Sequence, residues 1–201
     1  MNSKVALIIG AGTSLGSSIT KVFAGDNFTV VPARREGEKL KPLEEEINSK
    51  GGKCFSFSLD ARKEDEVQNF IERVEREIGE IEVAVYNIGA NIKYNLTETS
   101  SKKYFKVWEM ATFGAFLMGR EVAKNMIKRK RGTIIFTGAT ASIRGGDGFS
   151  AFAGAKNAKR ALAQSMAREL GPKGIHVAHI IIDGAMDTRW VNELFPEFVK
   201  Q

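Results

Sequence analysis

Short apolar runs rich in β-branched residues alternate with longer amphipathic stretches along the chain, and this alternation constrains the fold more than any other feature. It is typical of βαβ units, in which each strand of a parallel sheet is followed by a helix that packs back on the sheet. We therefore predict a single-domain, doubly wound α/β fold over residues 1–201, with strand order 3-2-1-4-5-6. The pattern predicts strands at Val5–Ile9, Phe28–Val31, Lys53–Ser58, Val83–Tyr86, Thr133–Thr137 and Ile175–Ile182, and helices at Ser17–Phe23, Leu40–Asn48, Glu64–Ile78, Ser101–Arg129 and Phe149–Leu170.

Composition places the chain among globular domains. Of its 201 residues, 43% are hydrophobic and 27% are charged, which is enough apolar material for a sizeable core. The single cysteine, Cys54, excludes an internal disulfide, and the apolar run Val5–Ile9 is too short for a signal peptide or a membrane span. We therefore expect a cytoplasmic protein that does not cross a membrane.

The formal net charge of +6 raises the question of an anionic partner. The densest basic cluster lies at the end of the predicted helix Ser101–Arg129 and comprises Lys124, Lys128, Arg129, Lys130 and Arg131. Cations there complement the helix dipole, and no aromatic residues alternate with them to stack on bases. A solvated helix end is the favoured interpretation, with nucleic-acid binding as a minor hypothesis.

The sequence predicts no metal site. Its two histidines, His176 and His179, are three residues apart in one predicted strand, so their side chains point to opposite faces of the sheet. No cluster of histidine and cysteine offers a set of metal ligands.

A glycine-rich turn follows the first predicted strand directly and opens the first helix. It reads Gly10-Ala11-Gly12-Thr13-Ser14-Leu15-Gly16. Glycines at such a turn let backbone N–H groups and the helix N-terminus approach a pyrophosphate closely. Because this turn lies between the first strand and helix of a βαβ series, it predicts a dinucleotide site of the Rossmann type.

The end of the second predicted strand indicates which dinucleotide is preferred. A site for NAD(H) usually carries a carboxylate there, about 20 residues past the turn, to bind the ribose 2′-hydroxyl. This chain has Val31-Pro32-Ala33-Arg34-Arg35 instead. Two guanidinium groups pair with a 2′-phosphate, so the sequence favours NADP(H), with a merely solvated loop as the alternative.

These motifs together resemble the short-chain dehydrogenase/reductase family along essentially the whole chain. The resemblance is carried by the glycine turn, Leu59-Asp60-Ala61, Asn87-Ile88-Gly89-Ala90, Lys156 four residues after Phe152, and Asp183-Gly184 followed by Thr188. It implies that Asp60 and Ala61 hold the adenine, that Asn87 and Gly89 back the middle of the cofactor, and that Gly184 to Thr188 contact the nicotinamide. One position departs from the family pattern, because Ser14 replaces a glycine of the turn and is expected to weaken cofactor binding.

The same resemblance implies a catalytic tetrad of which one member is retained. The family uses a serine, a tyrosine, a lysine and an asparagine, and their positions fall on Ala139, Phe152, Lys156 and Ala111. Residues four apart share a helix face, so the lysine ammonium lowers the pKa of the phenol and also holds the nicotinamide ribose. Only Lys156 can act here, which predicts an atypical member with a degenerate site.

The usual rate contributions of these groups indicate how much activity their replacement removes. A positioned general acid contributes roughly 10²–10⁴ in rate and an oxyanion donor roughly 10²–10³. Hydride transfer by the family's usual route should therefore be slow or absent. Catalysis relocated to a neighbouring hydroxyl is the alternative, and the candidates, which equally suit capping or turn bonding, are Thr137, Thr140, Ser142 and Ser150.

Two hypotheses for function remain open. The first is an NADP(H)-binding oxidoreductase that acts on a small carbonyl or alcohol substrate, with impaired or relocated catalysis. The second is a non-catalytic NADP(H)-binding protein with a regulatory or interaction role. Family members usually continue with one more helix and strand, and the resemblance implies homo-oligomerisation through the Ser101–Arg129 and Phe149–Leu170 helices.

Overall fold

The structure is a computed structural model that describes residues 4–184. Its strands are β1 (Lys4–Ile9), β2 (Thr29–Arg34), β3 (Lys53–Cys54), β4 (Phe57–Ser58), β5 (Glu80–Tyr86), β6 (Gly132–Thr137) and β7 (Ile175–Ile180). Its α-helices are α1 (Leu15–Gly25), α2 (Lys41–Ser49), α3 (Glu64–Glu77), α4 (Ser101–Trp108), α5 (Gly114–Arg129) and α6 (Ser150–Leu170). Single turns of other helix types lie at η1 (Gly37–Leu40), η2 (Leu96–Glu98), η3 (Glu109–Phe113), η4 (Thr140–Ser142) and η5 (Gly171–Lys173).

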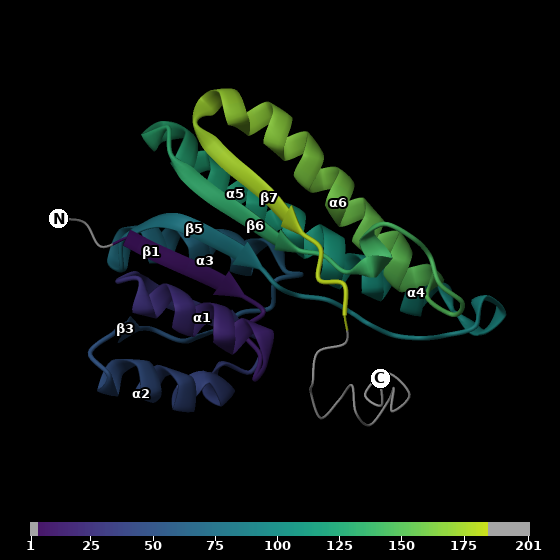
Figure 1. The fold of residues 1–201 in the computed structure, drawn as a ribbon, viewed down its shortest axis with the longest axis horizontal. Helices are drawn as coiled ribbons and strands as arrows, with labels where there is room; N and C mark the ends of the chain where they lie inside the picture. The colour runs from purple at the N-terminus through teal and green to yellow at the C-terminus, as the bar shows by residue number, and fades with distance from the viewer. Residues whose placement is uncertain (1–3, 185–201) are drawn as a thin grey trace.

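All strand pairs are parallel, and the sheet has the order β3-β2-β1-β5-β6-β7, with β4 also paired to β2 (Figure 1). The predicted doubly wound topology is therefore confirmed. The order reverses between β1 and β5, where the chain leaves one half of the sheet for the other. At such a switch point the loops at the carboxyl ends of adjacent strands diverge and leave a crevice.

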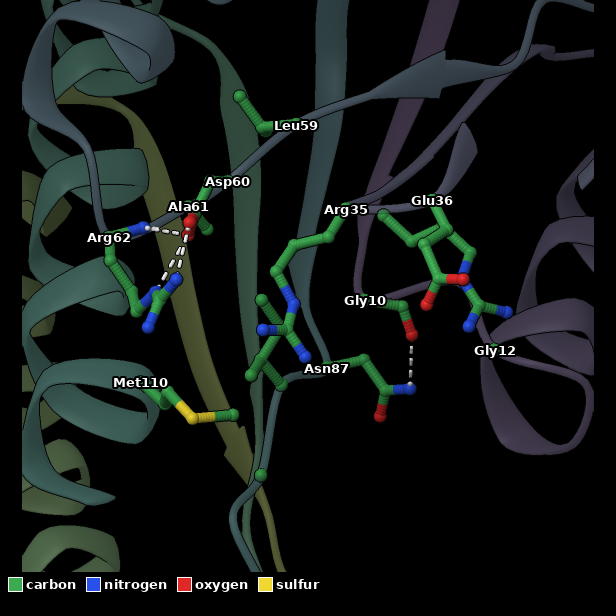
Figure 2. A pocket seen from close by; sticks show the side chains of 13 residues that line it. Gly10, Gly12, Arg35, Glu36, Leu59, Asp60, Ala61, Arg62, Asn87 and Met110 are labelled. Carbon is green, nitrogen blue, oxygen red and sulfur yellow. Dashed lines mark hydrogen bonds and ion pairs between the residues drawn. The ribbon is translucent and has the colours of Figure 1, made fainter. Parts of the chain in front are cut away.

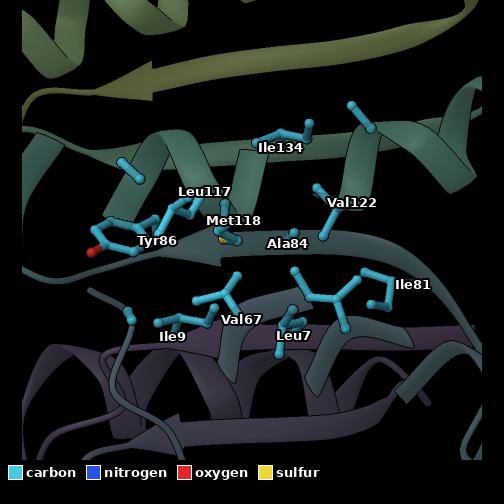
Figure 3. Close-up of a cluster of buried hydrophobic side chains, with 14 of the residues drawn as sticks. Leu7, Ile9, Val67, Ile81, Ala84, Tyr86, Leu117, Met118, Val122 and Ile134 are labelled. Atoms are coloured by element: carbon cyan, nitrogen blue, oxygen red, sulfur yellow. The ribbon is translucent and has the colours of Figure 1, made fainter. Parts of the chain in front are cut away.

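Alternate residues of β1 face the two helical layers, which explains its unbroken apolar run. Val5, Leu7 and Ile9 belong to the larger core, against α3, α5 and α6, whereas Ala6 and Ile8 face α1 and α2. Figure 3 shows part of the larger core, in which Leu7 and Ile9 of β1 lie with side chains of β5, α3 and α5. Burial on both faces holds the central strands, and hence the loops at their ends, in fixed positions.

The predicted third strand, Lys53–Ser58, is wrong as one element. It forms two short strands, β3 opposite Thr29–Val30 and β4 opposite Ala33–Arg34. Pro32 lies in the intervening stretch of β2, and proline has no N–H to donate to a ladder. The last predicted strand likewise ends at Ile180, whose carbonyl accepts from the N–H of Gly138 just beyond β6.

The predicted long helix Ser101–Arg129 is also interrupted. The π-helical turn η3 separates α4 from α5, and the Tyr86 hydroxyl donates to the carbonyl of Met110 within it at 2.7 Å. Gly114 follows this turn, and a Cβ there would lie 2.1 Å from the Tyr86 Oη atom. The buried phenol thus fixes the place at which the helix changes its winding, next to the switch point of the sheet.

The basic cluster on and after α5 is largely neutralised by neighbouring carboxylates. Arg129 pairs with Glu75 at 2.7 Å, Lys124 pairs with Glu121, and Arg131 pairs with Glu80 and Glu82. These ion pairs favour the solvated helix end over a nucleic-acid surface. Within residues 4–184, no helix is long and apolar enough to cross a membrane.

Candidate functional site

The turn between β1 and α1 is shaped by close backbone packing at its two ends. Gly10 has φ +93°, and a Cβ there would lie 2.9 Å from backbone atoms of Asn87 and Ile88. A Cβ on Gly16 would lie 2.6 Å from the Gly10 carbonyl oxygen and from Ala11 Cα. Both positions therefore require glycine for packing within the protein.

Gly12 differs from these two glycines because a Cβ there would meet no atom within 4 Å. Its open side faces a cavity of about 270 Å³, whose lining it shares with Gly10 (Figure 2). No packing contact among residues 4–184 requires glycine at this position, so the space is free for a ligand's approach to the backbone. The turn and the N-terminus of α1 thus fit the pyrophosphate of a dinucleotide.

Asn87 joins this turn to the next strand of the sheet. Its backbone N–H donates to the Ile9 carbonyl at 2.8 Å, and its side-chain amide donates to the Gly10 carbonyl at 3.1 Å. These bonds fasten the end of β5 to the end of β1 across the switch point. The cavity lies above them and is lined by Gly10, Gly12, Arg34, Arg35, Glu36, Leu59, Asp60, Ala61, Arg62, Asn87, Ile88, Gly89 and Met110.

The charges of the cavity are arranged unevenly. Arg62 binds the Asp60 carboxylate through two nitrogens, at 2.8 and 2.5 Å, and these hydrogen bonds hold the pKa of Asp60 below its usual value. Glu36 pairs with Lys39, which lowers the pKa of that carboxyl too. Within the described residues, neither Arg34 nor Arg35 forms an ion pair. Figure 2 shows Arg35 reaching into the cavity between the Asp60–Arg62 pair and Asn87.

Lys156 does not line the cavity itself but lies next to Gly89, which does. The Lys156 ammonium donates to the Thr137 carbonyl at 3.2 Å and lies 5.5 Å from the centre of the Phe152 ring. A Cβ on Gly89 would be 3.5 Å from its Nζ atom, so the lysine lies against the edge of the cavity. Burial lowers the pKa of Lys156 to about 8.

The other tetrad positions bring no polar side chain to this end of the site. Ala111 is fully buried in η3, Phe152 is buried on α6, and Ala139 begins the turn η4. Thr112, next to Ala111, uses its hydroxyl to donate to the Ala155 carbonyl of α6 at 2.7 Å. Of the four positions that the resemblance assigns to the tetrad, Lys156 is therefore the one that carries a polar side chain.

Three of the four neighbouring hydroxyls are already engaged, in agreement with the capping interpretation. Ser142 accepts from the Ala139 N–H at 3.1 Å, Thr137 donates to the Tyr86 carbonyl, and Thr140 donates to the Asp183 carboxylate. Ser150 differs, because its buried hydroxyl has no hydrogen-bond partner among the described residues. In this conformation Ser142 is therefore occupied by its own turn.

The remaining predicted cofactor residues divide into three groups. Ala61 is buried in the cavity wall beside Asp60, and Ser14 and Leu15 begin α1 on the flank of the glycine turn. Gly184 is exposed just beyond β7. Thr188 lies outside the described residues, so its predicted contact with nicotinamide stays a prediction.

Sequence motifs did not predict several residues of the site. Glu36, Arg62 and Met110 line the cavity, and Lys159 is fully buried beside Lys156. Two of them carried a usable signal: Arg62 follows Asp60 by two residues, and Lys159 is three residues after Lys156, on the same helix face. No group of histidine, cysteine and carboxylate residues within positions 4–184 is arranged to hold a metal ion.

The fold and cavity define a dinucleotide-binding α/β protein, and comparison with known proteins narrows this class. Residues 4–197 match the family model described as short chain dehydrogenase. The chain therefore belongs to the short-chain dehydrogenase/reductase family, whose members are oxidoreductases that use NAD(P).

Individual relatives agree with this assignment. A crystal structure of a short-chain dehydrogenase from Rhodopseudomonas palustris is 49% identical, with a TM-score of 0.88, covering 100% of this chain and 93% of that chain. The uncharacterized oxidoreductase YuxG of Bacillus subtilis is 32% identical over 91% of this chain, which spans only 27% of that protein's length. A 3-oxoacyl-[acyl-carrier-protein] reductase of Bos taurus is 25% identical, covering 98% of this chain and 82% of the bovine protein.

Proposed function

We propose that this protein binds NADP(H) in preference to NAD(H) and acts as an oxidoreductase on a small carbonyl or alcohol substrate. The observation that carries the cofactor preference is the pair of arginines at the end of β2. Arg34 and Arg35 line the cavity and form no ion pair with any residue that the structure describes, whereas the nearby carboxylates of Asp60 and Glu36 are occupied by Arg62 and Lys39. Two free guanidinium groups suit a 2′-phosphate, and no free carboxylate repels it.

The chain offers a binding group for each part of the dinucleotide. The glycine turn and the N-terminus of α1 would hold the pyrophosphate, the Asp60–Ala61 wall the adenine, and Lys156 the nicotinamide ribose. Asn87 and Gly89 would support the middle of the cofactor. When bound, the nicotinamide supplies or accepts the hydride, and the protein's part is to place the substrate and move one proton.

Hydride transfer in this protein should be slow. Phe152 and Ala139 cannot donate a hydrogen bond to a substrate oxygen, and Ala111 cannot support Lys156. Lys156 is the tetrad member left with a transferable proton. The protein is thus a family member with impaired or relocated catalysis.

A second candidate function is a non-catalytic, NADP(H)-dependent regulatory or interaction protein. It is favoured by the occupied state of the nearby hydroxyls, because Ser142, Thr137 and Thr140 are bound within the protein. Binding without turnover supports this second function. Turnover of NADPH with any small carbonyl compound supports the first.

The cofactor proposal is tested by thermal denaturation of the purified protein with NADPH and with NADH. A ligand at 100 times its dissociation constant adds roughly 2.7 kcal/mol to the free energy of unfolding, which raises Tm measurably. We expect a larger rise with NADPH than with NADH. Equal rises would contradict the preference, and no rise with either would contradict cofactor binding.

The proposal extends to homo-oligomerisation through the helices α4, α5 and α6. Exposed aromatic side chains occur at Tyr104, Phe105 and Phe116, and rings stack in series from Phe105 through Trp108 and Phe113 to Phe116. Large exposed aromatic surface is typical of a protein interface. We also propose a cytoplasmic location, with which the free thiol of Cys54 is compatible. Sedimentation of the protein and of a Phe105→Glu variant tests the interface.

A further inference from the structure

Two lysine side chains lie beside each other beneath the carboxyl ends of β5 and β6. Lys156 is 5% exposed and Lys159 is 0% exposed, and both project from the same face of α6. The Lys156 ammonium donates to the Thr137 carbonyl and the Lys159 amine to the Ile88 carbonyl, each at 3.2 Å. The two side chains also hydrogen-bond to each other, so one nitrogen must serve as the acceptor.

The surroundings of this pair contain no compensating negative charge. Within the described part of the chain, neither lysine forms an ion pair with a carboxylate. The titratable groups that face the pair are His179 of β7 and the Tyr86 phenol of β5, whose ring centre lies 5.5 Å from the Lys159 nitrogen, and Arg160 of α6 acts on His179. Two buried ammonium ions would repel each other here, and one backbone carbonyl for each nitrogen offsets only part of the loss of hydration.

The effect on protonation follows from burial and proximity. Burial, and then the charge of Lys156, lowers the pKa of Lys159 well below the usual lysine value. The pKa of Lys156 falls less, because burial is partly opposed by its hydrogen bond to Lys159. Burial is the largest cause that lowers the pKa of His179 to about 4, so that side chain stays neutral near pH 7. The lowered pKa values of both lysines thus favour a single proton on the pair near pH 7.

The pair lies where the reaction needs a proton. Phe152 and Ala139 have no hydroxyl, and Lys156 lies against both the Phe152 ring and the Gly89 edge of the cavity. Ala111 has no amide to support Lys156. Lys159 instead contacts Lys156 directly through its side chain. An acid that works near neutral pH needs a pKa near that pH, and burial brings Lys156 to this range.

We propose that Lys156 and Lys159 form a lysine pair that shares one proton, in which Lys156 protonates the substrate oxygen and Lys159 is the positioning residue that holds the Lys156 ammonium group. This inference rests on the proposed function. In reduction, the carbonyl carbon receives a hydride from NADPH, and the C=O π electrons become a lone pair on oxygen. That oxygen takes a proton from Lys156, which leaves the alcohol, NADP⁺ and a neutral Lys156 amine. A proton from solvent then restores the pair.

The shared proton is tested without cofactor, by NMR titration of lysine side chains labelled with ¹³C at Cε. The Lys156 signal is expected to titrate near pH 8 in the native protein. Lys159→Met removes the acceptor amine, so the Lys156 midpoint should fall. Lys159→Gln supplies an acceptor oxygen and should move the midpoint back towards the native value. Lys102→Met, which removes an exposed lysine of α4, is the matched control and should leave it unchanged.

The direction of the change decides the first part of the proposal. A raised Lys156 midpoint in Lys159→Met would mean that Lys159 is charged and repels Lys156. An unchanged midpoint would mean that the two amines do not interact, and an ordinary midpoint near pH 10.5 in the native protein would mean that no proton is shared. Each of these three results overturns the lysine pair, whether or not NADPH binds.

The acid role is tested by NADPH oxidation with a panel of small ketones and aldehydes that includes diacetyl. The rate should fall as pH rises through the Lys156 midpoint, and Lys159→Met should shift this fall to lower pH and change kcat more than KM. Lys156→Met should lose at least tenfold in kcat. Native activity in Lys156→Met overturns the acid role, as does absence of turnover while NADPH still raises Tm. If NADPH does not raise Tm, the proposed function is contradicted. The NMR titration, which needs no cofactor, then still decides whether the two lysines share a proton.

Discussion

The two ends of the candidate site, the cavity near α1 and the region near α6 around Lys156, differ in what they need from the sequence. At the end near α1, binding rests on backbone: Gly10 and Gly16 are fixed by packing, and Gly12 leaves open space. At the end near α6, chemistry rests on single side-chain atoms, and Phe152 and Ala139 lack them. The first end can therefore be intact while the second is not. Substitutions that keep the fold therefore retain backbone-based binding more readily than they retain catalysis by individual side chains.

Packing explains why the substituted end still folds. Phe152 is buried on α6 and Ala139 has an ordinary extended backbone, so neither replacement disturbs the helix or the turn. Ser142 still caps its turn on the Ala139 N–H. A loss of function at this end costs the fold nothing, and restoring the missing atoms should cost little as well.

The largest expected effect is a gain of activity at the α6 end. The Ala139→Ser, Phe152→Tyr double variant restores an oxyanion donor and a phenol four residues before Lys156. We expect reductase activity with NADPH and small carbonyl compounds to rise by roughly 10²–10⁴, the usual contribution of a positioned general acid. Steady-state NADPH oxidation measures this gain.

The Ala139→Ser single variant is the matched control, because it restores the hydrogen bond to oxygen without a new acid. Its gain should be smaller than that of the double variant. A double variant that binds NADPH and stays inert would show that the difference between the two ends lies elsewhere than in Ala139 and Phe152.

The next effect concerns the binding end. Arg35→Gln removes one of the two guanidinium groups without an ion pair in the cavity. If it contacts the 2′-phosphate, the variant should lose roughly 1.5–3 kcal/mol of NADPH binding, the range for a hydrogen bond to a charged group, and little NADH binding. Calorimetric titration with both cofactors gives the two values. Arg73→Gln, a surface charge on α3, serves as control, and a parallel loss for NADH would contradict a 2′-phosphate contact.

The sequence predicted the fold well because the parallel sheet is buried on both faces and its strands are therefore almost continuously apolar. The glycine turn and Asn87 could also be predicted from the sequence, because each directly follows a predicted strand. The split of Lys53–Ser58 depends on its pairing with Pro32, and the turn η3 depends on the Tyr86 hydroxyl. These contacts join segments that are far apart in the sequence. The hydrophobic periodicity of a single segment cannot predict them.

The cofactor end showed the same limit. The sequence pointed to Arg34 and Arg35 because they lie at the end of a strand. That neither pairs with a described carboxylate depends on where Arg62 and Lys39 reach. Lys159 was overlooked because a lysine in an amphipathic helix normally faces water, and here it is fully buried. The electrostatics of the site depend on which side chains of different helices, strands and loops pair with one another. The spacing of residues within a motif does not predict these pairs.

Two glycines of the turn, Gly12 and Gly16, allow a finer comparison within the binding end. Gly16→Ala places a Cβ 2.6 Å from the Gly10 carbonyl oxygen, so the free energy of unfolding should fall by about 1–3 kcal/mol. Gly12→Ala meets no neighbour and should leave stability nearly unchanged, yet weaken NADPH binding. Urea denaturation and cofactor titration of both variants separate the two roles. Equal destabilisation by both would show that Gly12 also serves packing.

The smallest expected effect concerns the stability of the lysine end. Lys159→Met replaces a fully buried amine by a chain of similar length, and the free energy of unfolding should rise by about 1–2 kcal/mol at pH 7, because the desolvation of the amine costs more than its hydrogen bond to the Ile88 carbonyl contributes. In the native protein, burial lowers the pKa of Lys159 well below its ordinary range and that of Lys156 to about 8. Between these values and the unfolded value near 10.5, the unfolded chain binds more protons, so stability rises with pH. Lys159→Met removes one of the two groups responsible, and urea denaturation at pH 7 and 9.5 should therefore give a smaller rise than in the native protein. An equal rise in both proteins would show that Lys159 keeps its proton on folding, and the α6 end would then hold two charges where the surrounding residues offer no counter-charge.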